Sequence, residues 1–127
     1  MNIFGEIHHV AIIVSDYERA KSFYVDALGF TVIRENYREK TRDWKLDIHC
    51  GNCELEIFGK ADAPDRQRIP ETCGYRHLAF RVPCVKDAIA ELEKRGVACD
   101  PIRIDEYTHN ALTFLRDPEG NVLELHE

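Results

Sequence analysis

The segment IHHVAIIVSDYERAKSFYVDALGF, residues 7–30, joins a strand pattern directly to a helix pattern. Residues 7–14 are rich in β-branched side chains, which favour a strand. Ser15 and Glu18 have the spacing of a capping box, and apolar side chains then recur at helical intervals as far as Gly29. Because glycine commonly ends helices, we predict a strand over 7–14 and then a helix of about 12 residues.

The same order of elements occurs twice along the chain. After the first helix, the expected elements are strands at 30–37, 44–50 and 53–58, a polar connector at 59–74, a strand at 75–82, a helix at 85–95, and strands at about 97–105, 111–116 and 121–126. The last two strands are separated by Asp117-Pro118-Glu119-Gly120, which has the proline and glycine placement of a type I turn.

The two halves match at a single offset of 68 residues. The matching pairs include His9 and His77, Ala11 and Ala79, Ala20 and Ala88, Leu55 and Leu123, and Glu56 and Glu124. This pattern indicates an internal duplication of a strand–helix–three-strand unit. Two copies are too few for a solenoid, so we expect a pseudo-symmetric pair that shares one site.

Two histidines and two glutamates lie at matching points of this repeat. Glu56 and Glu124 alternate with apolar neighbours and therefore point away from the expected core. His9 and His77 each share a strand face with an alanine, which leaves room beside an imidazole. Each residue alone is typical of a structural histidine or a solvated glutamate. Mid-strand carboxylates are costly to bury unless paired or metal-bound, so the joint repeat favours a divalent metal site.

Length and charge exclude several functional classes. The chain has 127 residues, enough for one domain, and its 17 Lys and Arg against 23 Asp and Glu give a net charge of −6. This balance argues against a nucleic-acid partner, which needs a basic surface. The longest apolar run, residues 10–14, is far below the roughly 20 residues of a membrane span. The N-terminal residues lack signal-peptide features, so we expect a cytoplasmic protein that binds no membrane.

The five cysteines do not form a disulfide framework, because their number is odd and their spacing irregular. Cys50 and Cys53 form a C-x-x-C sequence around Gly51 and Asn52, which is also a two-residue hairpin turn between two strand patterns. We interpret these thiols as flanking a turn. A redox pair or half of a zinc knuckle is the alternative, although no second C-x-x-C completes a knuckle.

Four motifs together resemble the vicinal oxygen chelate superfamily, which includes glyoxalase I, extradiol dioxygenases, and fosfomycin- and bleomycin-resistance proteins. They are HVAI (9–12), FYVDALGF (23–30), GYRHLAF (74–80) and DPEGNVLEL (117–125). The chain looks most similar to small bacterial glyoxalase-I-like proteins. The resemblance implies an α+β fold, a single domain of two tandem βαβββ modules, about 7–58 and 75–126, whose curved mixed sheets surround a metal site.

Carried over residue by residue, the resemblance implies the metal ligands His9, Glu56, His77 and Glu124. Such a set looks like that of glyoxalase I, whereas extradiol dioxygenases and fosfomycin-resistance enzymes place no ligand at the position of Glu56. The implied cofactor is one divalent ion per site, Ni or Zn before Fe, Mn or Co. The implied reaction is that of a lyase or isomerase on a 2-oxoaldehyde–thiol hemiacetal, through an enediolate, with Glu124 as base and Glu56 as its partner.

The sequence departs from the glutathione-binding pattern at Ile13 and Lys60, where those enzymes carry Arg and Asn. A different thiol or a small acid is therefore the expected substrate. Other cations and hydroxyls lie in or near expected loops and are candidates for binding it, or are solvated surface: the segment 37–42, Arg66, Arg68, Arg76, Arg103 and Tyr107. The family also leaves open a dioxygenase or transferase, or a ligand-binding protein without turnover. We expect a homodimer, with the site built within one chain or across the dimer.

Overall fold

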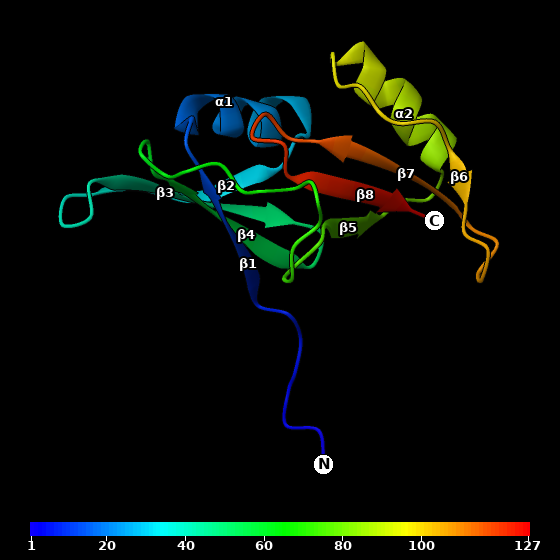
Figure 1. The fold of residues 1–127 in the computed structure, drawn as a ribbon, viewed down its shortest axis with the longest axis horizontal. Helices are drawn as coiled ribbons and strands as arrows, with labels where there is room; N and C mark the ends of the chain where they lie inside the picture. The colour runs from blue at the N-terminus through cyan, green and yellow to red at the C-terminus, as the bar shows by residue number, and fades with distance from the viewer. The chain divides into compact units, whose positions relative to one another are not determined.

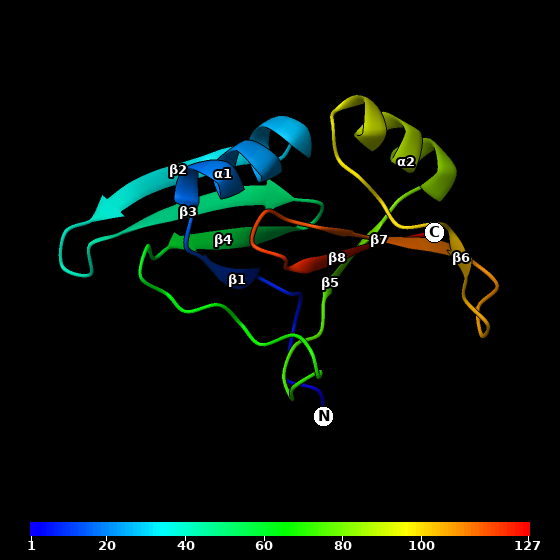
Figure 2. The same cartoon turned by 45° about the horizontal axis from the view of Figure 1, so that its top comes forward.

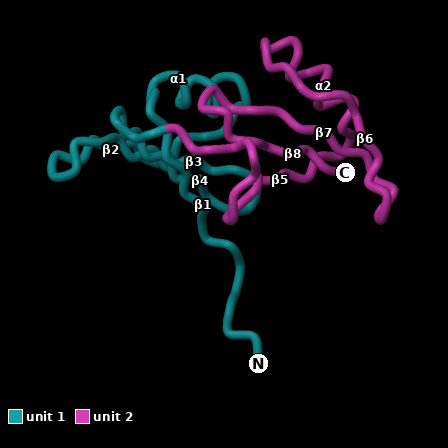
Figure 3. Tube along the Cα trace, in the orientation of Figure 1, with its two compact units in different colours: residues 1–64 teal, residues 65–127 magenta.

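The structure, a computed structural model, describes residues 1–127 and divides into two compact units, residues 1–64 and 65–127 (Figure 3). Each unit contains a four-stranded mixed sheet and one helical segment (Figure 1). The division falls inside the segment 59–74, which the sequence indicates as a connector. The α+β class and the strand–helix–three-strand order of both modules are thereby confirmed.

Unit 1 forms a sheet with the strand order β1-β4-β3-β2. Its elements are β1 (His9–Val14), α1 (Tyr17–Lys21), the π-helix η1 (Ser22–Ala27), β2 (Thr31–Arg38), β3 (Asp43–Cys50) and β4 (Cys53–Gly59). β1 runs parallel to β4, and the other neighbours are antiparallel. The first strand and the last strand of the repeat are therefore adjacent, so side chains at paired positions of the two strands lie on the same face of the sheet.

The core of unit 1 lies between the helical segment and one face of the sheet. Alternate residues of β3 and β4, including Leu46, Ile48, Leu55 and Ile57, are fully buried, and Tyr24 of η1 is 1% exposed. Figure 2 shows α1 lying over the sheet on this side. Glu54, Glu56 and Phe58 alternate with the buried residues and so occupy the opposite face, as the sequence pattern predicts.

The helical segment ends before Gly29 as predicted, but its N-cap residue and the geometry of its second half differ from the prediction. Asp16, not Ser15, caps the N-terminus, because its carboxylate accepts a hydrogen bond from the Arg19 N–H at 3.1 Å. The segment continues to Ala27, but its second half is π-helical, and the Leu28 N–H donates to the Phe23 carbonyl at 2.9 Å. Gly29 follows with a φ of 81°, consistent with its predicted role as the helix stop.

Unit 2 repeats this arrangement with the strand order β5-β8-β7-β6. Its elements are β5 (Leu78–Arg81), α2 (Val85–Lys94), β6 (Arg103–Ile104), β7 (Ala111–Arg116) and β8 (Val122–His126). β5 is parallel to β8, and Val85, Leu115 and Leu123 are among the buried core residues. No helix of either unit is both long enough and apolar enough to span a membrane.

Two strands of unit 2 are shorter than predicted. The strand expected at 75–82 begins only at Leu78, so His77 lies immediately before β5. The strand expected at about 97–105 is reduced to the two residues of β6 and an isolated bridge between Cys99 and Leu115. Pro101 lies between these two points, and because proline has no N–H to donate, it interrupts the ladder.

Candidate functional site

The strand register carries the sequence repeat into the structure. In unit 1, Ala11 of β1 pairs with Glu56 of β4, and in unit 2, Ala79 of β5 pairs with Glu124 of β8. Both pairs obey the 68-residue offset. In each unit the candidate histidine lies two residues before this alanine in the chain.

Each unit thereby brings one histidine and one glutamate together. His9 Nε2 lies 3.5 Å from Glu56 Oε2, and His77 Nε2 lies 3.6 Å from Glu124 Oε2. Both glutamate side chains are 13% exposed, and the histidines are 42% and 24% exposed. These separations are wider than a good hydrogen bond, and two ligands that each lie about 2 Å from one metal ion have a similar spacing. The donor atoms therefore fit a shared divalent ion in chemistry and in spacing.

The four predicted ligands lie in the structure as these two pairs, one in each unit. No group of three or more His, Cys, Asp or Glu side chains gathers as a metal-binding cluster. The four-residue metal site therefore stays a prediction, while the contact within each pair is observed.

A second histidine contacts the pair of unit 1. His8 immediately precedes β1, which begins at His9, so the alternation of the strand does not fix the direction of its side chain. The Nδ1 atoms of His8 and His9 lie 2.8 Å apart, so one ring donates to the other. This contact engages the Nδ1 side of His9 and leaves Nε2 turned toward Glu56, the kind of outer contact that orients metal-binding imidazoles.

The two pairs have chemically different neighbours. In unit 1, Lys45 Nζ lies 3.6 Å from Glu56 Oε1 and 2.9 Å from Asp47 Oδ1, and Arg34 Nε lies 2.6 Å from Asp47 Oδ2. In unit 2, the Phe114 ring stands edge-on to His77, with ring centroids 5.4 Å apart. The pair of unit 1 is thus embedded in an ion-pair network, whereas the pair of unit 2 has an apolar wall.

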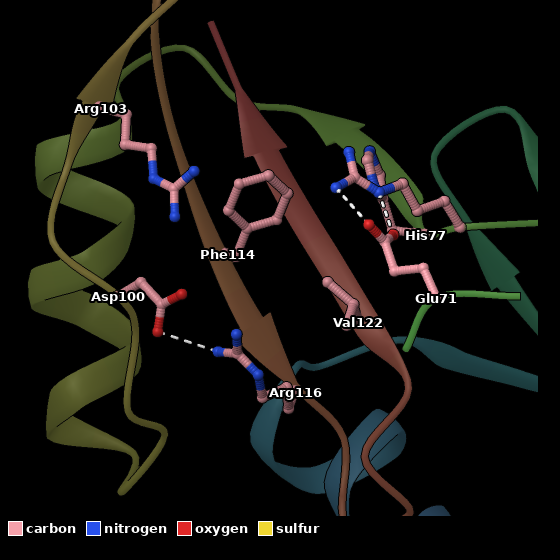
Figure 4. A pocket seen from close by; sticks show the side chains of 8 residues that line it. Glu71, His77, Asp100, Arg103, Phe114, Arg116 and Val122 are labelled. Atoms are coloured by element: carbon pink, nitrogen blue, oxygen red, sulfur yellow. Dashed lines mark hydrogen bonds and ion pairs between the residues drawn. The ribbon is translucent and has the colours of Figure 1, made fainter. Parts of the chain in front are cut away.

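A cavity of about 230 Å³ lies on the His77 side of unit 2 (Figure 4). Its lining is rich in charged side chains and consists of Glu71, Arg76, His77, Asp100, Arg103, Phe114, Arg116 and Val122. Arg76 and Arg103 are among the sequence candidates for substrate binding. Phe114, Arg116 and Asp100 were not, because only the pairing of β7 with β8 shows that Phe114 lies beside Glu124.

Other candidate residues take part in contacts within the chain. Lys60 Nζ lies 2.7 Å from Asp43 Oδ2, and Arg38 holds the same carboxylate through two nitrogens. The hydrogen bonds from Arg38 and Lys60 lower the pKa of Asp43 well below its ordinary value. Lys60 therefore already has a carboxylate partner within the chain. The Ile13 side chain, at the other position that departs from the glutathione-binding pattern, is 55% exposed.

The C-x-x-C cysteines flank a hairpin turn, as predicted. Cys50 pairs with Cys53 across Gly51 and Asn52, the two thiols are free, and their sulfur atoms lie 4.0 Å apart. Burial raises the pKa of the Cys50 thiol to about 12. Because the thiolate is the reactive and metal-binding form, this environment does not favour a redox pair or a zinc knuckle.

Comparison with known proteins agrees with the geometry. A family model described as the Glyoxalase/Bleomycin resistance protein/Dioxygenase superfamily matches residues 6–125. The chain is 48% identical to the uncharacterized protein YwkD of Bacillus subtilis (strain 168), covering 98% of each protein. It is 46% identical to the uncharacterized protein YaeR of Escherichia coli (strain K12), covering 96% of this chain and 95% of YaeR.

A solved structure also matches the whole fold. The crystal structure of a glyoxalase family protein from Enterococcus faecalis superimposes with a TM-score of 0.93 at 48% identity, covering 99% of this chain and 100% of that chain. The family match covers nearly all of the chain, including both histidine–glutamate pairs. The chain therefore belongs to the glyoxalase/bleomycin resistance protein/dioxygenase superfamily.

Proposed function

We propose that this chain is a metal-dependent lyase or isomerase of the glyoxalase I type, which acts on the hemiacetal of a small 2-oxoaldehyde and a thiol, or on a related small acid. The observation that carries the proposal is the histidine–glutamate pair that occurs once in each unit, at 3.5 and 3.6 Å and at the same register. A two-histidine, one-carboxylate iron site, as in many oxygenases, includes only one carboxylate ligand and would leave the second glutamate without a role at the metal.

The four side chains His9, Glu56, His77 and Glu124 would together hold one divalent ion, Ni or Zn. When bound, such an ion acts as a Lewis acid toward two neighbouring oxygens of the substrate. We assign the base to Glu124, which would take the proton from the carbon beside the carbonyl and return it to the adjacent carbon. The product, a 2-hydroxy thioester, contains the same atoms as the hemiacetal, so the reaction needs no oxidant or reductant.

The surroundings of the two glutamates support this division of roles. Glu56 is held by Lys45 at 3.6 Å, within a network that also includes the buried Asp47. Glu124 lies beside His77 and faces Phe114 across the strand pair, with no lysine or arginine within ion-pair distance. A carboxylate that moves a proton must be able to reach the substrate, and the less restrained Glu124 meets this requirement better.

We further propose that the chain works as a homodimer on a small-molecule substrate. β1 and β5 both lie at the edge of their sheets, and the N-terminal side chains of Ile3, Phe4 and Ile7 are 79%, 81% and 69% exposed. Exposed apolar groups beside an unpaired strand edge are typical of a surface that another chain covers. The two pairs would then complete a site within one chain or between two chains.

The test is turnover of methylglyoxal mixed with several thiols, after reconstitution with Ni or Zn. We expect thioester formation by the wild type and a loss of roughly 10²–10⁴-fold in kcat for Glu124→Gln, because a positioned base contributes about that factor. Because Glu124 and Glu56 both belong to the proposed ligand set, Glu124→Gln and Glu56→Gln are each expected to lose bound metal as well.

Glu54→Gln is the matched control, since Glu54 lies on the same strand face but pairs with Arg34. This variant should retain metal and turnover. A wild type that holds stoichiometric metal yet converts none of the thiol hemiacetals would contradict the lyase assignment. Oxygen consumption by an iron-loaded form would instead favour a dioxygenase.

A further inference from the structure

The cavity beside His77 is large enough for a small molecule or one polar group of it, and too small for a drug-sized ligand. Its volume of about 230 Å³ lies below the roughly 300–1,000 Å³ of pockets for drug-sized ligands. All of its lining residues belong to unit 2, so unit 2 alone forms it. A ligand in this cavity would contact His77, which is a member of the proposed metal set.

The charges of the lining leave an excess of positive charge. Three arginines face two carboxylates, which gives a formal charge of +1 when His77 is neutral. Arg76 is occupied by a two-pronged contact to Glu71, at 2.6 and 3.2 Å. Arg116 makes a single contact to Asp100, from Nη1 to Oδ1 at 2.9 Å, which leaves other N–H groups of its guanidinium for a ligand.

Arg103 is the arginine of the lining without a carboxylate partner. Its guanidinium carbon lies 5.2 Å from the centroid of the Phe114 ring, a cation–π contact that orients the group without using its N–H donors. Figure 4 shows Arg103 and His77 on opposite sides of Phe114, with Arg116 below the ring. The same ring contacts His77. A ligand lying along Phe114 could therefore reach an arginine fork at one end and the histidine–glutamate pair at the other.

We propose that this cavity is a subsite for an oxoanion, the carboxylate or phosphate group of a compact substrate, with Arg103 and Arg116 as its binding residues. Arginine binds both groups through paired N–H donors, and Phe114 and Val122 supply an apolar floor for a short carbon chain. The assignment of this anion to the substrate rests on the proposed function. It agrees with the departure of Ile13 and Lys60 from the glutathione-binding pattern, because a different anionic group needs a different partner.

The subsite is tested without turnover, on the metal-free full-length chain. Binding of propylphosphonate, butyrate and the neutral butyramide is followed by chemical-shift changes of the backbone amides of residues 103–116. We expect both anions to bind and the amide not to bind. Arg103→Gln should weaken anion binding about tenfold or more, since a hydrogen bond to a charged group is worth that factor. Arg103→Lys, which keeps the charge but not the fork, should fall between the two.

Arg95→Gln is the matched control, because Arg95 is an arginine of the same unit that pairs with Glu91 and does not line the cavity. Equal binding of anions and amide, or equal losses in Arg103→Gln and Arg95→Gln, would overturn the subsite whatever the outcome for the lyase. Anion binding that depends on Arg103 in a chain without lyase activity would uphold the subsite and remove the proposed reaction. Tighter binding of the phosphonate assigns the subsite to a phosphate, and tighter binding of butyrate to a carboxylate.

Discussion

Asp43 is a buried carboxylate that accepts hydrogen bonds from two cationic side chains and one hydroxyl. The residue is 2% exposed, and it accepts hydrogen bonds from Arg38 at 2.8 Å, from Lys60 at 2.7 Å and from the Thr41 hydroxyl. The bond from Arg38, followed by those from Lys60 and Thr41, lowers its pKa. A carboxyl with a lowered pKa in the folded state stabilises the fold above its unfolded pKa of about 3.9 and loses that contribution as the pH falls through the folded value.

We therefore predict that Asp43→Asn lowers the unfolding midpoint in urea at pH 7 and that the difference from the wild type narrows as the pH falls below about 4. The variant removes the negative charge of Asp43, so the positive charges of Arg38 and Lys60 lose their carboxylate partner at neutral pH. Asp62→Asn, in an exposed turn, is the control and should unfold like the wild type. A gap between Asp43→Asn and the wild type that stays constant from pH 7 to pH 2 would contradict this role.

At the scale of single residues, the sequence predicts best what repeats. The pairing of His9 with Glu56 and of His77 with Glu124 follows from strand alternation and from the duplication, because both patterns can be recognised in a single amino-acid sequence. The cation–π partner Phe114 does not follow, since its position beside Glu124 depends on the register of β7 against β8. That register depends on the turn at residues 117–121, where a change of one residue places a different side chain opposite Glu124.

At the scale of elements, the contact of β4 with α1 depends on one glycine. Gly59 ends β4, and a Cβ atom placed on it would lie 2.7 Å from the Cβ of Tyr17 and 2.9 Å from its Cδ1. Tyr17 cannot move freely, because its ring stacks on Trp44 with the centroids 5.2 Å apart. The first turn of α1 would have to shift away from the sheet.

We predict that Gly59→Ala destabilises the fold by about 1–3 kcal/mol, the usual cost of overpacking. The measurement is the free energy of unfolding in urea. Gly5→Ala is the matched control, because nothing lies within 4 Å of its added methyl group. A stability of Gly59→Ala within about 0.5 kcal/mol of the wild type, the usual range for surface changes, would show that α1 yields without cost.

Element existence was predictable here, but element ends were not. The helix pattern after β1 is correct, yet the switch to π-helix at Ser22 leaves no mark in the apolar spacing. The cap moves from Ser15 to Asp16 because both residue types accept backbone hydrogen bonds, and the local backbone decides between them. Pro101 carried a usable signal, since a proline inside a strand pattern weakens the assignment.

At the scale of the whole chain, the duplication is close but incomplete. The offset of 68 relates the β1–β4 pairing to the β5–β8 pairing. It does not hold for the neighbouring strand, because Glu56 pairs with Asp47 whereas Glu124 pairs with Phe114. The offset would have placed Leu115 opposite Glu124. The hairpin between β3 and β4 has two residues, whereas the connection between β7 and β8 has five, residues 117–121. The different turn lengths shift the register and give the two pairs their different neighbours, one charged and one aromatic.

We predict that both pairs are needed for one metal site. His9→Ala and His77→Ala should each lose bound Ni or Zn, measured by elemental analysis after dialysis, and lose turnover with it. His49→Ala is the control, since His49 is an exposed histidine of β3 outside both pairs. Full metal content in either of the two variants would show that the pair of the other unit suffices, and the four-ligand site would be wrong.

Mixing the two inactive variants then decides how the pairs combine. If each site takes one pair from each of two chains, a refolded equimolar mixture of His9→Ala and His77→Ala contains dimers with one intact and one doubly altered site, and about a quarter of the wild-type activity should return. If both pairs come from the same chain, every site in the mixture keeps one defect and no activity returns. Sedimentation of the wild type, which we expect to be dimeric, must accompany the test, because a monomer could only build the site from its own two units.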